Sequence, residues 1–564
     1  MKKIISLLLF IVVVGSCARS TPKPYSDYKL SSGFSTSSTD SATLDNLEVL
    51  CRVWGFVKYH HPVFADSIID IDSSLFDLLP RVAKATSKIR NKILLEWVES
   101  LGRFDTDKPY YQQMLDTMDY EIINEPEWIN DKKTLGRKLS RTLTKLRYTP
   151  RDSNYYAALN PWAGNLNFDH EKDYQNFNDC GYRLLSFFRY WNIIEYFFPY
   201  KPLMDRSWDT VLREYMPEFI NPVRDTYYPL IARLTTELDD SHATTGGVFD
   251  WRRDRIDLGV VENKLIVLSS DKFAKPGKKE LMPGDEIVEI DGKSLDSIIT
   301  KISKYLAHSN QARLNYLLGY YAIRSTSPFI MGSTKFNSVK IKYMRNSVLK
   351  DTTVVLDANK ITPNIKQEPY KLINDSIGYI YAGKFDYKNV NDLIGKLKNT
   401  KGIVVDLRCY PSAFLIDPFI HEWILKDSTP VAIYSFPLVT FPGYFIKRTT
   451  YFGAGKPDCY QGKIVVMVND QTVSNAEYTT MAFQAGPRTT VIGSQTQGAD
   501  GNISRVPFLG GQFSNFSGLG VYYPDGGQTQ RVGIRIDEIV EPTIEGIKAG
   551  RDEVLERAIE IINE

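Results

Sequence analysis

One segment constrains the fold of this chain most, because it joins an apolar strand to an apolar helix through a short polar turn. The continuous apolar stretch Ile464–Val468 is typical of a buried strand, and Ser474 opens the helical run that follows. Further apolar runs that are typical of buried strands lie at 377–381, 402–408 and 490–493. With a helix expected at 390–397, strands and helices alternate, which predicts an α/β core in the last third of the chain.

Ser474 is the first candidate functional residue. A serine at a strand-to-helix junction places its hydroxyl near free N–H groups of the helix, which can stabilise an oxyanion. A second interpretation stays open at this point. Ser474 with Glu477 three residues later also forms a capping box, which by itself accounts for both residues.

The amino-terminal residues predict export and a lipid anchor. Lys2 and Lys3 precede the apolar run Ile4–Val14, as in a secretory signal peptide. Val14-Gly15-Ser16-Cys17 resembles a bacterial lipobox, so Cys17 is expected to become the lipidated first residue; the alternative is a plain signal peptide in which Cys17 is incidental. We therefore expect a membrane-anchored lipoprotein of the cell envelope, on its periplasmic or outer-surface side.

Charge and cysteine usage exclude several classes of function. The 69 Lys and Arg balance the 67 Asp and Glu, and no basic stripe predicts nucleic-acid binding. The four cysteines after Cys17 show neither the spacing of a zinc site nor a dense disulfide framework. Structural free thiols are expected, and one disulfide is the alternative that export leaves open. The four cysteines are Cys51, Cys180, Cys409 and Cys459.

An internal repeat predicts two related helical hairpins in the first half of the chain. Eight residues recur 137 positions later, and both copies have apolar residues at helical spacing. The first copy holds Leu47, Arg52, Trp54, Tyr59, Pro62, Asp72, Leu75 and Pro80; the second holds Leu184, Arg189, Trp191, Tyr196, Pro199, Asp209, Leu212 and Pro217. Aromatic residues at this spacing favour a scaffold role.

The segment from 281 to 293 predicts a turn, a strand and a tight Asp-Gly turn. It resembles the PDZ module of exported proteases, which binds a peptide end as an added strand. Residues 295–324 are expected to form a helical insertion before closing strands near 339–343 and 352–356.

Residues 230–563 resemble the tail-specific (carboxyl-terminal-processing) serine protease family. Four features carry this resemblance, in the order in which the family has them. They are the PDZ-like segment, the strand that ends in Asp406-Leu407-Arg408, the turn Ser474-Asn475-Ala476-Glu477, and a tail with Tyr523-Pro524-Asp525-Gly526, Val532-Gly533-Ile534 and 550–556. The resemblance implies a crotonase/ClpP-like protease core, a polypeptide substrate recognised in part through its carboxyl terminus, and no metal or cofactor.

The resemblance also implies how the serine is activated. One branch of the family uses a lysine about 25 residues after the serine, but Ala499 stands there. The tricorn-like branch uses a histidine in an Asp-x-His motif, which Asp240-Ser241-His242 matches. His242 is therefore expected to be the general base, with the Ser241 hydroxyl orienting it.

Two departures from the family pattern concern the groups around the reaction. Gln528 or Gln530 stands where tricorn-like enzymes have a glutamate, so an amide is expected to orient the site. Ser412 and Ala413 replace the usual Gly-Gly whose backbone N–H completes the oxyanion hole, while the N–H of Asn475 is expected to be the other donor.

Together these observations predict an α/β multidomain protein with a helical amino-terminal region. The expected parts are a leader at 1–16, a stalk at 17–45, the helical region at 46–245, the PDZ-like module at 250–358 and the catalytic core at 370–564. The expected function is a serine peptidase acting through an acyl-enzyme on Ser474. Two alternatives stay open: a catalytically decayed peptide-binding lipoprotein, and an envelope protein that binds small molecules or glycans through its many Tyr and Trp residues.

Overall fold

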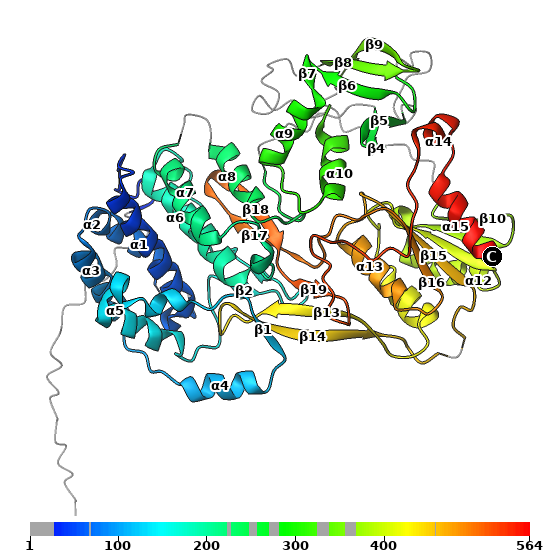
Figure 1. Cartoon of the computed structure of the whole chain (residues 1–564). Helices are drawn as coiled ribbons and strands as arrows, with labels where there is room; N and C mark the ends of the chain where they lie inside the picture. The colour runs from blue at the N-terminus through cyan, green and yellow to red at the C-terminus, as the bar shows by residue number, and fades with distance from the viewer. Residues whose placement is uncertain are drawn as a thin grey trace, which may run out of the picture.

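The computed structural model shows a helical region, a small sheet unit and an α/β core, and further strands lie between the helical region and the core (Figure 1). It describes residues 28–66, 69–222, 227–246, 256–269, 281–323, 338–355, 368–456 and 458–564. The predicted leader and the lipidation site Cys17 lie outside these residues. None of the described helices combines the length and hydropathy needed to span a membrane.

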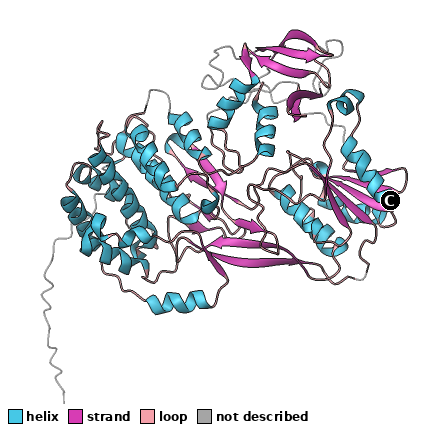
Figure 2. Ribbon diagram, in the orientation of Figure 1, coloured by secondary structure: helices cyan, strands magenta, loops and turns pink. Residues whose placement is uncertain are grey.

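Two helical hairpins dominate the amino-terminal region (Figure 2). The first is α1 (Ser41–His60) with α2 (Ile71–Val82), and the second is α6 (Cys180–Phe197) with α7 (Trp208–Ile220). Each hairpin is closed by the same hydrogen bond: the indole N–H of Trp54 donates to the carbonyl of Ile71 at 3.0 Å, and that of Trp191 to Trp208 at 2.9 Å. These partners lie 137 positions apart, so the two hairpins share their closure as well as their sequence.

The two hairpins also exchange ion pairs. Arg52 of the first pairs with Asp209 of the second at 2.9 Å, and Arg189 of the second pairs with Asp72 of the first. The latter pair is buried and also includes Glu171, whereas Asp209 is largely exposed. The two ion pairs thus occupy corresponding positions of the repeat, and each joins one hairpin to the other.

Shorter elements fill the space between and around the hairpins. They are α3 (Ser87–Ser100), α4 (Lys108–Asp116), β1 (Tyr120–Ile122), α5 (Lys132–Arg147), β2 (Ala158–Leu159), β3 (Leu166–Asn167) and α8 (Tyr227–Thr236).

The sheet unit consists of antiparallel strands with two helices beside them. Its strands follow the order β4-β5-β6-β8-β9, and β7 pairs with β6. Their bounds are β4 (Asp257–Val261), β5 (Lys264–Ser269), β6 (Glu286–Ile290), β7 (Lys293–Ser294), β8 (Ser338–Arg345) and β9 (Val348–Val355). The insertion expected at 295–324 forms α9 (Leu295–Tyr305) and α10 (Gln311–Tyr321). That this unit is a PDZ module stays a prediction.

The core contains a six-stranded sheet in the order β10-β11-β12-β15-β16-β20, in which only β10 runs antiparallel. The strands are β10 (Tyr370–Ile373), β11 (Ile377–Tyr381), β12 (Gly402–Asp406), β15 (Lys463–Val468), β16 (Thr489–Gly493) and β20 (Glu538–Ile539). The helices are α12 (Val390–Leu397), α13 (Asn475–Gln484), α14 (Ile544–Ala549) and α15 (Glu553–Asn563), with a π-helical segment at Ile416–Ile424.

The strands of this sheet are apolar throughout because both faces are covered. Val466 packs on the side of α13, while its neighbours Val465 and Met467 pack on the side of α15. The predicted α/β multidomain fold with a helical amino-terminal region is confirmed.

A second group of strands ties the core to the helical region. The sheet β1-β14-β13-β19 joins β1 of the helical region to β13 (Thr429–Pro437), β14 (Tyr444–Phe452) and β19 (Gly520–Tyr522) of the core. The hairpin β17 (Ile503–Pro507) and β18 (Phe513–Ser517) buries Val506 and Phe516 in the apolar core of the helices. Residues of the two regions therefore meet at the end of β18.

Candidate active site

Ser474 occupies the turn between β15 and α13. Its backbone has φ 57° and ψ −121°, a left-handed conformation that residues with a side chain rarely adopt. Its N–H donates to the carbonyl oxygen of Ala499 at 2.9 Å, which holds the turn against a neighbouring loop. A strained backbone at a strand-to-helix turn is typical of functional sites and of exposed nucleophiles.

Glu477 fixes the same turn from inside. Its carboxylate is buried and accepts N–H bonds from Ser474 at 3.2 Å, Gly498 at 2.8 Å and Ala499 at 3.0 Å. Burial raises the pKa of Glu477 to about 7, against the lowering effect of these hydrogen bonds. The glutamate half of the capping box therefore forms, and the same carboxylate also holds the loop behind the serine.

That loop depends on a glycine at position 498. Gly498 has φ +64°, and a Cβ atom there would lie 2.8 Å from the backbone of Arg531. Since the N–H of Arg531 donates to the carbonyl of Gly498 at 2.8 Å, two loops pass each other without room for a side chain.

His242 is oriented by a serine and an aspartate. Its Nδ1 atom lies 3.0 Å from Oγ of Ser517, and Ser517 Oγ donates to Oδ1 of Asp240 at 3.0 Å. Because that hydroxyl gives its only proton to Asp240, Nδ1–H of His242 must be the donor to Ser517. The Nε2 atom is then left with the free lone pair that a general base requires.

Asp240 is the buried anchor of this chain of hydrogen bonds. It is fully buried, and it also accepts the N–H groups of His242 at 3.0 Å and Ser517 at 2.6 Å. Gln530 adds a further hydrogen bond to Oδ1 at 3.0 Å. Such multiple donors stabilise the carboxylate, which can balance the positive charge that His242 acquires on taking a proton.

The surroundings keep His242 neutral. Burial lowers the pKa of its imidazole, Asp240 opposes this effect, and the guanidinium of Arg313 lowers the pKa further. A neutral imidazole is the form that accepts a proton from a serine.

The structure corrects several predicted roles. Ser517, and not Ser241, holds His242; the Ser241 hydroxyl instead donates to the carbonyl of Gln497 at 2.8 Å. Of the two candidate glutamines, Gln530 reaches the site through Asp240, while the side-chain oxygen of Gln528 accepts the N–H groups of the two residues that follow it.

The two expected oxyanion donors near 412 also differ from each other. The Ser412 N–H donates to the carbonyl of Ala382 at 3.0 Å, so it is not directed at a substrate. Ala413 remains the candidate of that pair. Asn475 supplies the first N–H of α13, which is one of the donors that a helix leaves free at its start.

Ser474 and His242 are attached to one common loop but are not bonded to each other. In this loop, the carbonyl of Ala499 accepts the Ser474 N–H. The carbonyl of Gln497 accepts the hydroxyl of Ser241, the residue before His242. Among the hydrogen bonds of the described residues, none joins the Ser474 hydroxyl to His242. Catalytic hydrogen bonds are often long in the absence of substrate and tighten in its complex.

Sequence reasoning missed the roles of Asp240 and Ser517. Asp240 stands in the Asp240-Ser241-His242 motif, but the motif assigned the orienting role to Ser241 instead. Ser517 lies 275 positions from His242, and hydrogen bonds between the segment 240–245 and β18 bring the two residues together.

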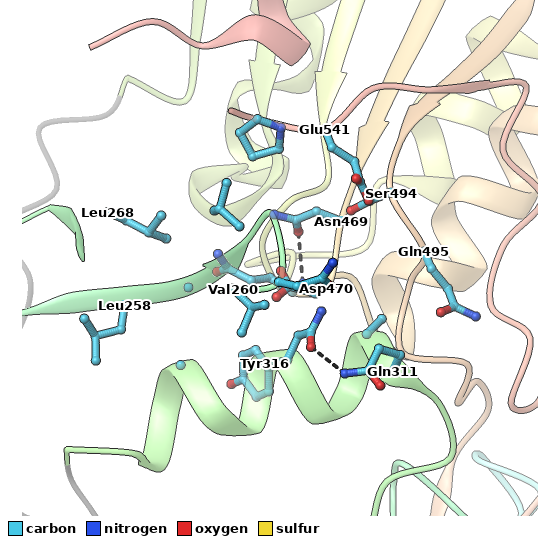
Figure 3. Close-up of a pocket in the computed structure, with 18 of the residues that line it drawn as sticks. Leu258, Val260, Leu268, Gln311, Tyr316, Asn469, Asp470, Ser494, Gln495 and Glu541 are labelled. Carbon is cyan, nitrogen blue, oxygen red and sulfur yellow. Dashed lines mark hydrogen bonds between the residues drawn. The ribbon is translucent and has the colours of Figure 1, made fainter. Parts of the chain in front are cut away.

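A cavity of about 530 Å³ lies between the sheet unit and the core, close to the serine turn (Figure 3). It is bordered by β4 with Val260, by α10 with Tyr316, and by the turn of Asn469 and Asp470 that precedes Ser474. Its charged lining residues are the acidic Asp257, Glu262, Asp470 and Glu541.

A serine on a strained turn, and a histidine linked through Ser517 to a buried aspartate, resemble the nucleophile and the base of serine hydrolases. Residues 424–540 match Peptidase family S41. This match confirms the predicted resemblance to tail-specific proteases.

One curated relative is the carboxy-terminal-processing protease of Bartonella bacilliformis, which is 27% identical over 307 residues. The match covers 52% of this chain and 63% of the relative, so this chain spans less than two thirds of that protein's length. Two solved structures of mature CPAF, one of them complexed with lactacystin, share the fold with TM-scores of 0.53. They are 10% and 11% identical, and each match covers 68% of this chain and 98% of CPAF.

Proposed function

We propose that this protein is a serine peptidase that cleaves polypeptides through an acyl-enzyme on Ser474. The observation that carries the proposal is the chain His242–Ser517–Asp240, which leaves Nε2 of the histidine free to accept a proton. His242 takes the proton of the Ser474 hydroxyl as the oxygen attacks the peptide carbonyl, and returns it to the departing amine.

The developing oxyanion is held by backbone donors. The N–H of Asn475 at the start of α13 is the first, and the N–H of Ala413 is the second. One such donor contributes about 10² to 10³ in rate, so the loss of the Gly-Gly pattern at 412–413 is expected to matter mainly through the position of a single N–H.

The test is hydrolysis of a mixed peptide library by the full chain, with products identified by mass spectrometry. We expect cleavage by the wild type, none by Ser474→Ala and almost none by His242→Ala, with no effect of a metal chelator. Cleavage that persists in Ser474→Ala contradicts the mechanism.

The second candidate function is peptide binding without catalysis. It is favoured by the absence of a hydrogen bond between the Ser474 hydroxyl and His242 among the described residues, and by the use of the Ser412 N–H within the fold. Peptide binding by the wild type without any product would support this candidate, and turnover that is lost with Ser474 excludes it.

The location proposed for the protein is the cell envelope, with a lipid at Cys17. The charged start, the apolar run and the lipobox-like sequence support this proposal. Intact-mass analysis of the protein from membranes is expected to show a chain that starts at Cys17 and carries acyl groups; an unmodified Cys17 contradicts it.

A further inference from the structure

A second cavity, of about 810 Å³, lies between the β2–β3 hairpin and the strands β13 and β14. Its lining is mainly aromatic and aliphatic and comes from both the helical region and the core. The large lining side chains are Leu159, Trp162, Tyr434, Phe436, Leu438, Ile446 and Leu519.

Trp162 is the most unusual of these residues, because it is 97% exposed. Its position is nevertheless defined. The N–H groups of Trp162 and Ala163 both donate to the side-chain oxygen of Asn160 at 3.1 Å, and the Asn502 amide donates to the Ala163 carbonyl at 2.7 Å. A large exposed aromatic side chain on a fixed turn is typical of a binding surface.

The turn that carries Trp162 is docked directly on β13. Gly164 has φ +75°, and a Cβ atom there would lie 2.4 Å from the ring of Phe436. The β2–β3 hairpin of the helical region therefore packs firmly against β13 and forms one side of the cavity.

Three lining residues lie close, in packing or in sequence, to residues around Ser474 and His242. Tyr434 packs against Tyr478, one turn after Ser474 on α13, with ring centres 5.5 Å apart. Asn502 follows the loop whose Ala499 binds the Ser474 N–H. Leu519 comes two residues after the serine that holds His242.

The charged residues that line the cavity are Asp152 and Arg448, of which Arg448 carries the positive charge. It is exposed at the lining, its guanidinium lies 5.8 Å from the ring centre of Phe436, and it takes part in none of the ion pairs found among the described residues. A guanidinium beside an apolar surface suits an anionic group next to an apolar side chain.

We infer that this cavity binds a large apolar side chain of the peptide substrate, that Trp162 covers this side chain, and that Arg448 pairs with a neighbouring carboxylate of the same peptide. The inference rests on the proposed peptidase function and adds its substrate class. It makes the β2–β3 hairpin of the helical region part of the substrate-binding surface.

The test compares two peptides that differ only by Phe or Ala at the position that library cleavage shows to be preferred. We expect the wild type to favour Phe in kcat/KM by on the order of 10- to 100-fold, the range for apolar pocket contacts. Trp162→Ala is expected to remove most of this preference by lowering kcat/KM for the Phe peptide. The variant should fold as the wild type does, because an exposed side chain supports no folded core. Tyr110→Ala, which removes an exposed aromatic side chain from α4 outside the cavity, is the matched control and should behave as the wild type. A preference that survives in Trp162→Ala overturns the inference.

Arg448 is tested with a Glu and Gln peptide pair. Arg448→Gln should abolish the preference for Glu, and Arg448→Lys should keep part of it, since a lysine retains the charge without the planar fork. An unchanged preference for Glu in Arg448→Gln overturns the role of Arg448.

Binding separates this inference from the proposed function. In the Ser474→Ala background, fluorescence anisotropy of a labelled peptide library with a single Phe or Ala at each position measures affinity without hydrolysis and without cleavage data. Affinity that depends on Trp162, in a protein that cleaves no peptide, supports the cavity and contradicts the peptidase. Cleavage with no dependence on Trp162 in either assay supports the peptidase and overturns the cavity.

Discussion

Replacing Asp240 by asparagine tests the least expected part of the site. Asp240 accepts four hydrogen bonds, three on Oδ1 and one, from the Ser517 N–H, on Oδ2. An asparagine keeps one acceptor oxygen. If this oxygen takes the Oδ1 position, the amide NH2 group takes the place of Oδ2. Oδ2 accepts the Ser517 N–H at 2.6 Å in the wild type, so in the variant two donors face each other.

The two effects of this substitution differ in size. An unsatisfied buried N–H costs about 1–3 kcal/mol of folding free energy. Activity should fall further, because the Ser517 hydroxyl can turn to donate to Nδ1 and leave His242 in the wrong tautomer. The analogous tautomer error in a serine protease triad costs about 10⁴ in kcat. We expect a loss of about 10² to 10⁴ in kcat/KM, which is about 2.7–5.4 kcal/mol at 1.36 kcal/mol per tenfold change.

The assay combines kcat/KM over a range of pH with denaturant unfolding. Because Asp240 raises the pKa of His242, its removal should move the acidic limb of the profile to lower pH. Asp239→Asn is the control: its carboxylate accepts the Asp205 N–H at 2.7 Å and takes no part in the chain to His242. A loss below tenfold, or an acidic limb that does not move, would refute the reasoning.

Three further predictions follow from other contacts. Ser474→Gly should abolish hydrolysis yet be about 1 kcal/mol more stable than Ser474→Ala in denaturant unfolding, since glycine accepts φ 57° without strain; equal stability contradicts this. In the wild type, kcat/KM should rise with pH along a limb whose midpoint lies below the value of about 6.5 of a free histidine, because burial lowers the pKa of His242; a midpoint above that value contradicts it. Arg189→Met should cost about 3–5 kcal/mol by leaving Asp72 buried without its partner, whereas the repeat-equivalent Arg52→Met should cost at most about 1 kcal/mol; similar costs would show that burial does not separate the two pairs.

The parts of the fold that follow local patterns could be predicted from sequence. The strand of Ile464–Val468 and the turn at Ser474 are visible because a sheet covered on both faces requires uninterrupted apolar strands. The helical repeat is visible in the sequence because both hairpins use a tryptophan at the same position. The indole N–H groups of Trp54 and Trp191 each bind a carbonyl of the following helix.

The arrangement around His242 could not be predicted in the same way. Ser517 ends a β hairpin that packs into the helical region, and no local pattern states where that hairpin lies. Ser241 was the nearer hydroxyl in sequence, but the backbone directs it toward Gln497. The cavity wall at Trp162 also depends on a long-range contact, that of Gly164 with Phe436.

The central claim is that Ser474 is a nucleophile activated by His242. The most direct measurement is intact-mass labelling of the full chain with a fluorophosphonate probe, beside Ser474→Ala, His242→Ala and the Asp239→Asn control. The account predicts one probe per wild-type and control chain, none on Ser474→Ala and almost none on His242→Ala. Labelling of His242→Ala at the wild-type rate, or labelling that persists in Ser474→Ala, would contradict it.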